Sequence, residues 1–461
     1  MKLNWKTWTM LFTLVIIAVF SFADSEYYWY QTSEGGETAK GFTRPEEDDG
    51  EWNPQDWVLF AIKNGMLITN SATIKGRNGW SVGLNSSSEN KLIFSAYPDF
   101  YSKDFWLGKD ADPENAHEVI DFINYVSWEW ELEPRKTFYK RYKNEDGMKF
   151  NHLDYTVRFN DPSENFPLEA VHFNPTVLNT LEEEDKLKTN NKNKAVVTES
   201  KRYSSVEIKN NDLTLKVGTN DLVLEIDSLE FEGDLNIVVE PTVDIGNAGD
   251  VFLFLDSCSE INGSRTIGND AFKEKTHIFY RGSDDFIISG SGLVYASLYL
   301  QNAGLQTKAS GGGLHEVVSI SSGDISLNSK PEEQNQGTEG TEGTDRLCDS
   351  IYSLKSKVLV DSDGIINKGI VTGGSLVDVG CAGGGNLSSF TLEYIYAPKA
   401  HVRFNYDSTF EGSYIGDSIT INSGSIEIKG PPHDVIEKPI IPQPNASNGS
   451  GGDGEGDWLI P

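Results

Sequence analysis

The chain has 461 residues, of which 70 are acidic and 39 are basic, so its formal charge at pH 7 is −31. This excess of acid argues against duplex nucleic acid and anionic membranes as partners, because both are bound through Lys and Arg side chains. Only 38% of the residues are hydrophobic, but an aromatic content of 11% and a regular apolar periodicity argue against a disordered chain. The length allows two or three domains, or one elongated domain.

The N-terminal segment 1–23 has the features of a secretory signal peptide. Lys2 and Lys6 form a short basic region, residues 10–22 are apolar, and a small-x-small cleavage site ends at Ala23. The apolar stretch is shorter than the roughly 20 residues that a transmembrane helix needs. We therefore expect cleavage, an extracytoplasmic location (secreted or at the cell surface) and no integral membrane segment in the mature protein. Retention as an N-terminal anchor, as in pilus-like proteins, is the alternative.

Cysteines are few, and Cys258, Cys348 and Cys381 cannot all pair within one chain. A disulfide between Cys348 and Cys381 and a set of unpaired thiols are both compatible with the sequence. No Cys or His spacing is typical of a zinc site.

Much of the chain alternates apolar and polar residues with a period of two, which is typical of strands with one buried face. Over residues 213–255 the alternating runs are short and end at turn residues, as at Gly218 and Gly233. The pattern predicts short strands separated by tight turns. Helical periodicity is nearly absent, and its two candidates are residues 113–126 and 177–187.

Short strands at this density suit a β-sandwich or a β-solenoid, and two features favour the solenoid. The aliphatic runs follow one another without long connections, as expected when each turn of chain stacks on the last. Segment 68–76 (ITNSATIKG) is also similar to segment 421–430 (INSGSIEIKG) at the opposite end of the chain. Both units combine aliphatic residues with a polar turn and a Gly corner, which fits a backbone that bends sharply between stacked strands. We predict an all-β parallel β-helix (β-solenoid) with loop insertions and one candidate helix near the N-terminus.

Three segments interrupt the predicted strands. Residues 181–202 are rich in Glu, Lys and Asn and are expected to form a polar loop. Residues 329–346 (SKPEEQNQGTEGTEGTDR) lack apolar side chains and are predicted to be a disordered insert. Residues 431–461 are rich in Pro and then in Gly, Ser and Asp, as in a flexible tail. The expected order is therefore a signal peptide, an aromatic-rich β region at 24–180, the polar loop, a β-solenoid at 203–430 and the tail.

Four short motifs follow one another in segment 394–430. They are Tyr-Ala-Pro-Lys-Ala at 396–400, Phe-Glu-Gly at 410–412, Ile-Gly-Asp-Ser-Ile-Thr-Ile at 415–421 and Ile-Glu-Ile at 426–428. The segment resembles the terminal repeats of a bacterial family of exported, largely uncharacterised β-solenoid domains, which occur in surface proteins, adhesins and proteins encoded with type IV pilus components. The resemblance implies a right-handed parallel β-helix and an extracytoplasmic location, and it implies no catalytic residues.

The opening of the chain carries a second, shorter part of this resemblance. Segments 61–76 and 108–114 are similar to the opening of the same kind of domain. The pattern also resembles bactofilins, which are polymer-forming β-helices of the cytoplasm, where proteins carry no cleaved signal. This second resemblance makes self-assembly a minor hypothesis.

Acidic residues that a polysaccharide lyase or hydrolase would need occur in runs at 46–49, 182–185 and 284–285. Such sites require paired carboxylates or a basic residue beside bound calcium. Basic residues such as Arg265 and Arg281 stand alone, and runs of like charge are typical of solvated loops. We expect no catalysis, and a β-helix carbohydrate-active enzyme is the alternative.

Calcium is the one cofactor that the acidic residues suggest. Asp361 and Asp363 begin like an EF-hand loop but lack its later ligands, and Asp110 and Asp112 form a second candidate pair. An ordinary Asp turn without a metal is the simpler interpretation of each pair, so at most weak calcium binding is expected.

Tryptophan is concentrated in the first third of the chain, where seven of the eight Trp residues outside the signal precede residue 131. Trp side chains form flat apolar platforms for sugar rings and anchor interfaces. Trp52, Trp106 and Trp128 are therefore the candidate ligand-contact residues. In segment 127–133 (SWEWELE), the alternation equally fits a strand with a buried aromatic face.

These observations predict an exported structural or adhesive β-solenoid that contacts surfaces, glycans or envelope components. The alternatives are the carbohydrate-active enzyme and a type IV pilus-associated component. Many acidic residues, such as Glu225, Glu230 and Asp417, fall between buried aliphatic residues. Outward acids keep a long, thin solenoid soluble and separate from its neighbours, which accounts for the net charge.

Overall fold

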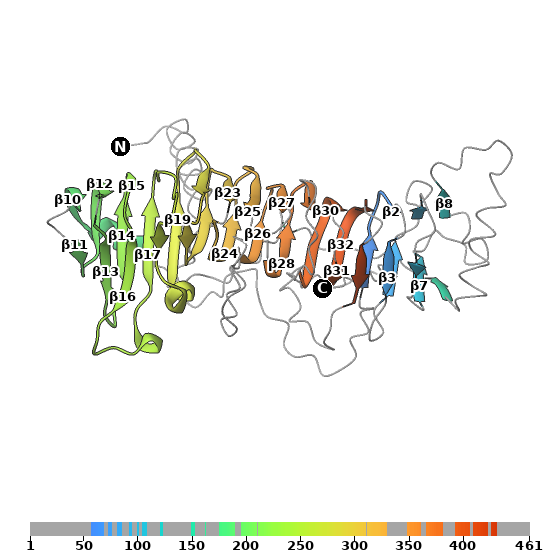
Figure 1. The fold of residues 1–461 in the computed structure, drawn as a ribbon, viewed down its shortest axis with the longest axis horizontal. Coiled ribbons are helices and arrows are strands. Elements are labelled where there is room, and N and C mark those ends of the chain that lie inside the picture. Colours follow the sequence, from blue (N-terminus) through green and yellow to red (C-terminus); the bar gives the residue numbers. More distant parts are fainter. Residues whose placement is uncertain are drawn as a thin grey trace, which may run out of the picture.

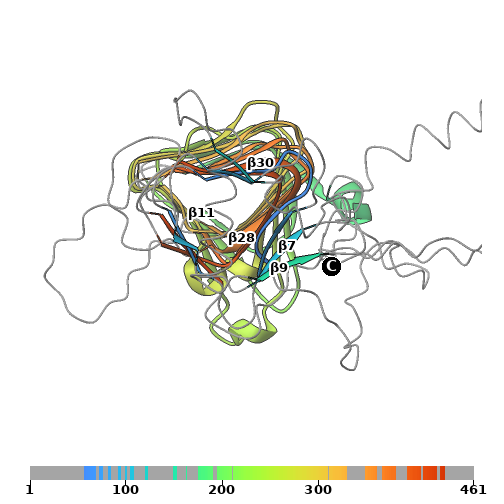
Figure 2. The ribbon, with the colours of Figure 1, turned by 90° about the vertical axis from the view of Figure 1, so that its right-hand side faces the viewer.

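The computed structural model is an all-β parallel solenoid (Figure 1). It describes residues 57–68, 72–75, 81–84, 92–94, 99–100, 104–107, 120–122, 149–152, 162, 175–189, 195–209, 211–309, 311–329, 348–360, 366–380, 392–405, 409–422 and 426–430. Viewed along the long axis, the strands outline a three-sided tube (Figure 2). Successive strands lie on different sides of the tube, and a strand on the first or second face pairs in parallel with the strand one turn later. The predicted fold class is confirmed.

The first face carries the longest run of stacked strands. It contains β14 (Leu222–Ile226), β17 (Val251–Leu255), β19 (Thr276–Tyr280), β22 (Ser297–Leu300), β24 (Leu314–Ser319), β26 (Cys348–Ser353), β28 (Ile366–Thr372), the first halves of β30 (Tyr394–Phe404) and β32 (Ser413–Ile421), and then β1 (Trp57–Ala61), β4 (Ser81–Leu84), β7 (Asp104–Leu107) and β9 (Lys149–His152).

The second face follows the first around each turn. It contains the second half of β12 (Lys201–Ile208), β15 (Leu229–Phe231), β20 (Phe286–Ile288), β23 (Leu305–Ala309), β25 (Ile325–Ser329), β27 (Val358–Val360), β29 (Leu376–Val379), the second halves of β30 and β32, and then β2 (Met66–Ile68), β5 (Leu92–Phe94) and β8 (Ile120–Phe122).

Two shorter sheets supply the third side. One contains β11 (Ala195–Val197), β13 (Leu213–Val217), β16 (Leu235–Val239), β18 (Thr266–Ile267) and β21 (Leu293–Val294), and the other contains β31 (Thr409–Glu411), β33 (Glu427–Lys429), β3 (Thr73–Lys75) and β6 (Asp99–Phe100).

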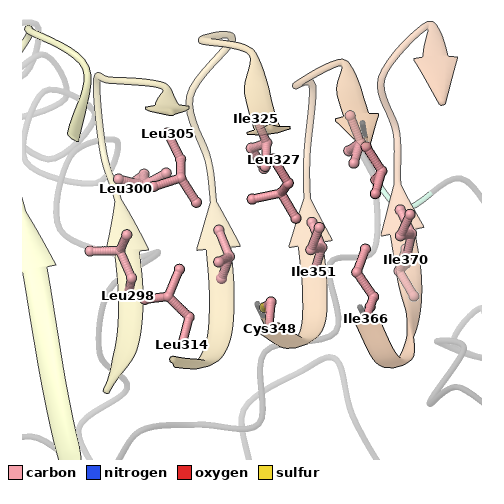
Figure 3. Close-up of a cluster of buried hydrophobic side chains, with 14 of the residues drawn as sticks. Leu298, Leu300, Leu305, Leu314, Ile325, Leu327, Cys348, Ile351, Ile366 and Ile370 are labelled. Atoms are coloured by element: carbon pink, nitrogen blue, oxygen red, sulfur yellow. The ribbon is translucent and has the colours of Figure 1, made fainter. Parts of the chain in front are cut away.

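The core is a column of aliphatic side chains inside the tube (Figure 3). Alternate side chains of a strand point to opposite faces, so the period of two in the sequence sends every second residue inward. Because the strands pair in register, Leu298 stacks on Val317 and then on Ile351, and all three are fully buried. Each such side chain contributes about 1.5–3 kcal/mol by its removal from water.

The strands nearest the N-terminus extend the C-terminal end of the stack. β1 and β2 both pair with β32, and β3 pairs with β33, so that Ile68 lies opposite Ile421 and Ile74 lies opposite Ile428. In Figure 1 the blue strands therefore stand beside the orange and red ones. The two similar segments noted at opposite ends of the chain are thus adjacent turns of one solenoid. Their similarity has a physical reason, because stacked turns bend around the same column.

The other end of the stack begins with a charged strand. Where we expected a polar loop over 181–202, β10 (Glu182–Lys188) pairs in parallel with β12, and β11 follows. The loop prediction was wrong because almost every side chain of β10 faces solvent, so the strand shows no apolar alternation, while its backbone pairs with β12. Charged side chains on an edge strand prevent further strands from adding to it.

Neither predicted helix is present in the described residues. Within 177–187, a 3-10 helix, η3 (Pro175–Thr180), precedes β10, and within 113–126, residues Ile120–Phe122 form β8. The described residues contain two further 3-10 helices, η4 (Ile245–Asn247) and η5 (Asp270–Lys275). The predicted signal peptide, the tail at 431–461 and nearly all of the insert at 329–346 lie outside the described residues.

Candidate interaction faces

The first face presents a column of aromatic and aliphatic side chains on the outer side of its strands. Phe254 and Phe279 stack with ring centroids 4.7 Å apart and planes 8° apart, and Phe279 and Tyr299 stack at 4.5 Å and 12°. Val318 and Tyr352 continue the column in register. We call these five residues the aromatic column. The rung spacing of about 4.8 Å brings rings at one position into stacking distance.

This column is not an open platform. Phe254, Phe279, Tyr299 and Val318 are buried, and Tyr352 is half-buried. At the end of the stack nearest β10, Val177 and Leu178 of η3 and then Leu181 pack against the same cluster. The covered surface is therefore part of the interior of the protein.

Of the three Trp residues predicted as ligand contacts, only Trp106 lies among the described residues. Trp106 belongs to β7, where its backbone pairs with Gly83, the partner of Phe60. Its backbone is therefore in register with Phe60 on the first face. Trp52 and Trp128 lie outside the described residues.

The second face has a different outer surface, which is polar near β29, β30 and β32. Asp378, Arg403 and Thr420 occupy one outward position on three successive rungs. Four neighbours on the same face join them. The resulting polar ladder consists of Asp378, His401, Arg403, Asn405, Ser418, Thr420 and Asn422.

Hydrogen bonds link the polar ladder from rung to rung. The Asn422 amide donates to the Asn405 side-chain oxygen, and the Asn405 amide donates to Asp378. The Arg403 guanidinium lies 3.6 Å from the Asp378 carboxylate and keeps 45% of its side-chain surface exposed. The ladder thus combines fixed internal bonds with a donor that is open to solvent.

His401 lies at the edge of this ladder, between two hydroxyl groups. Its Nδ1 contacts Ser418 Oγ, and its Nε2 lies 3.1 Å from Thr420 Oγ1. Burial, with a smaller effect of Arg403, lowers the pKa of His401, which favours the neutral ring. Burial raises the pKa of Asp378 despite the opposing effect of Arg403. A histidine whose two nitrogens are both engaged by hydroxyls is suited to holding rungs together.

The polar ladder is not among the site residues predicted from the sequence, although its signal is visible in three triplets. Val-Asp-Val at 377–379, Val-Arg-Phe at 402–404 and Ile-Thr-Ile at 419–421 each place a polar residue between two buried ones. The triplets align in space, and only the register of the strands reveals that alignment.

The remaining predicted site residues are not brought together in the part of the chain that is described. Asp110, Asp112, Asp361 and Asp363 lie outside the described residues. Within the described ranges, no group of three or more His, Cys, Asp or Glu side chains is arranged to hold a metal ion. No helix among these residues is long and apolar enough to cross a bilayer.

The two described cysteines are free thiols. Cys348 is buried in the core, and burial raises its pKa far above the ordinary value. Burial likewise raises the pKa of Cys258 to about 12. Both thiols are therefore poor nucleophiles at neutral pH. Cys381, the partner considered for Cys348, lies outside the described residues.

Comparisons with known proteins do not assign the chain to a family: no family model, no curated protein and no solved structure matches it.

Proposed function

We propose that this protein is an exported structural or adhesive solenoid that acts at the cell surface or outside the cell. In this proposal the stack of rungs is a rigid support, and the second face contacts glycans or other envelope polymers. The observation that carries the proposal is the contrast between the two long faces. The outer column of the first face is apolar and covered, whereas the second face presents the polar ladder with Arg403 exposed.

The solenoid suits a supporting role because its stiffness comes from repeated parallel pairing. Twelve successive pairings link β14 to β9 on the first face alone. At about 4.8 Å for each pairing, these strands span about 58 Å. Each rung is also fixed by the aliphatic column of its neighbours.

The polar ladder suits an extended ligand because its groups repeat along the solenoid axis. Its donors and acceptors are already held by bonds between rungs, so little side-chain entropy is lost when a ligand binds. A polymer that carries polar groups at regular intervals would engage several rungs at once. Glycans of the envelope have this chemistry.

The location is tested by fractionation and N-terminal sequencing of the native protein. We expect the mature chain to begin at Asp24 and to be found outside the cytoplasmic membrane. A cytosolic protein that retains Met1 would contradict the proposal. A chain that retains Met1 in the envelope would favour the pilus-associated alternative.

Binding is tested with purified envelope polysaccharides and isolated cell envelopes. The double variant Arg403→Ala/Asn422→Ala should lose at least tenfold in affinity, because it removes the exposed guanidinium and an exposed amide of the ladder. Lys216→Ala, on the third side, is the matched control and should bind like the unmodified protein. Equal binding by both variants would exclude the polar ladder as the contact surface.

A further inference from the structure

The outward position of the aromatic column stays apolar well beyond the five residues that define the column. Val371, Tyr396, Ile415 and Phe60 follow in register on β28, β30, β32 and β1, with 2%, 1%, 8% and 0% of their surface exposed. An outer sheet face that is buried over this length has a cover along that length.

Among the described residues, a cover is established at the end of the stack nearest β10. Val177, Leu178 and Leu181 pack on the group that contains Phe254 and Phe279. The column continues from there through every rung to Phe60. The question is which segment lies over the rest.

The order of the strands restricts the answer. β9 ends at His152 on the last rung beside β7, and η3 begins at Pro175 next to the first rungs, where Arg202 donates to the Leu178 carbonyl. Figure 1 shows β7 and β10 at opposite ends of the molecule. The chain therefore has to return along the whole stack between His152 and Pro175.

The number of residues in this connection limits the path that it can take along the solenoid. It has 22 residues, 153–174, and all of them except Pro162 lie outside the described residues. The return distance is about 58 Å at about 4.8 Å for each of the twelve pairings. A connection of this length reaches at most about 80 Å when fully extended. A path along one face fits this reach, whereas a path that winds around the solenoid does not.

The sequence of the connection matches the surface to be covered. In LDYTVRFNDPSENFPLEAVHFN, Leu153, Tyr155, Val157 and Phe159 recur at every second position. A period of two places such residues on one side of an extended chain. Further apolar residues follow toward Pro175, where the described cover begins.

We propose that the segment 153–174 docks on the aromatic column and its continuation to Phe60, and so forms a longitudinal strap on the first face. The strap joins the two ends of the solenoid and closes its apolar side. The second face, with its polar ladder, stays open. The proposal of a strap does not depend on which ligand, if any, binds to that face.

Photo-cross-linking tests the strap in the full-length mature protein. Tyr299 and Tyr352 are replaced one at a time by p-benzoylphenylalanine, which has a similar shape, and the captured peptides are identified by mass spectrometry. Peptides from 153–174 should dominate at both positions. Leu359, which lies half-buried on the outer side of the second face, is the matched control and should capture none of them.

The experiment uses a mixture of chains with normal and heavy isotopes, so that capture between copies is recognised by mass. Capture of residues 24–56 or 431–461, or capture mainly between copies, would assign the cover to another occupant and overturn the proposal. Absence of any cross-link to 153–174 from both positions would overturn it as well.

Discussion

Glu207 shows how a single carboxylate holds the first rungs of the solenoid together. Its side chain is 9% exposed and forms ion pairs with Lys186 and Lys188 of β10 and with Lys209. Hydrogen bonds from the three lysines lower the pKa of Glu207 to about 2. The ionised carboxylate of Glu207 is therefore the form that makes these ion pairs, and it links the charged edge strand β10 to β12.

Acid should weaken this link over a defined range of pH. Because the pKa of Glu207 is about 2 in the folded chain and 4.5 as its ordinary value, its contribution to stability is complete above pH 4.5. The contribution is lost as the pH falls toward 2. In urea unfolding at each pH, Glu207→Gln should reduce this loss between pH 4.5 and 2. Glu230→Gln, at the exposed neighbouring position, is the control, and equal pH profiles for both variants would contradict the assignment.

Glycines in the C-terminal motifs are required by close backbone contacts. At Gly412, a Cβ atom would lie 2.2 Å from the Glu393 carbonyl oxygen, and at Gly416 it would lie 2.7 Å from Val402 Cγ2. The neighbouring rung thus occupies the space of a side chain. This accounts for the Gly of the Phe-Glu-Gly and Ile-Gly-Asp motifs.

Gly412→Ala should destabilise the protein by about 1–3 kcal/mol, because added atoms in a closely packed site displace the neighbouring rung. Gly246→Ala is the control, since no atom lies within 4 Å of its added Cβ. Urea unfolding monitored by circular dichroism measures the difference. A Gly412→Ala variant as stable as the control would show that the two rungs are not in contact at this position.

At the scale of single elements, the strands that send apolar side chains into the core were predictable, and the edge strand β10 was not. Over residues 213–255, apolar residues occupy the alternate, inward positions of β13, β14 and β17, and these strands form as predicted. β10 (EEEDKLK) has no such alternation, because its side chains face solvent and its fold depends on the backbone of β12. Residues Ile120–Phe122 fall within a segment that was predicted to be helical from the Asp-Pro-Glu start signal at 112–114, and three residues are too few to distinguish a period of 2 from 3.6.

β10 should act as a barrier to end-to-end association. Its replacement by a neutral, β-forming edge in Glu183→Thr/Glu184→Val/Lys186→Thr is expected to produce concentration-dependent assemblies. Size-exclusion chromatography with light scattering measures this. The control carries the single exchange Lys216→Thr on the third side. A triple variant that keeps the mass of the unmodified protein at all concentrations would argue against the barrier.

The inward column should dominate stability. Ile351→Ala removes a fully buried side chain between Val317 and Ile370 and should cost about 2–5 kcal/mol. Val238→Ala, at an exposed position, should change stability by less than about 0.5 kcal/mol. Chemical unfolding distinguishes the two. Similar losses of unfolding free energy in both variants would contradict the assignment of Ile351 to the core.

At the scale of the whole molecule, the order of turns in space differs from their order in the sequence. The strands at 57–122 were expected in a separate aromatic-rich region, but the described ones stack on the last C-terminal rung. The similarity between 68–76 and 421–430 signalled related turns. It could not reveal that they are adjacent, because a solenoid repeat fits at any rung and the sequence contains no measure of distance.

The polar ladder illustrates the same limit for the candidate site. A period of two identifies outward positions, but it does not tell which outward residues share a face, because that depends on the number of residues in each turn. The register places Asp378, Arg403 and Thr420 in one line. Acidic residues on such outward positions contribute to the net charge of −31 of the whole chain.

The adjacency of the strands at 57–75 to those at 394–429 is the arrangement on which the continuous solenoid, the strap and the open second face all depend. Asn64 and Asp417 contact each other across this junction, and the Lys63 amide donates to the Asp417 carbonyl at 2.9 Å. The direct test is disulfide trapping in Asn64→Cys/Asp417→Cys, with Cys381→Ser in the background. We predict rapid formation of a disulfide within one chain under native conditions, and none in the control Asn64→Cys/Asp244→Cys. Failure of the first pair to form that bond, with both thiols reactive, would contradict the account.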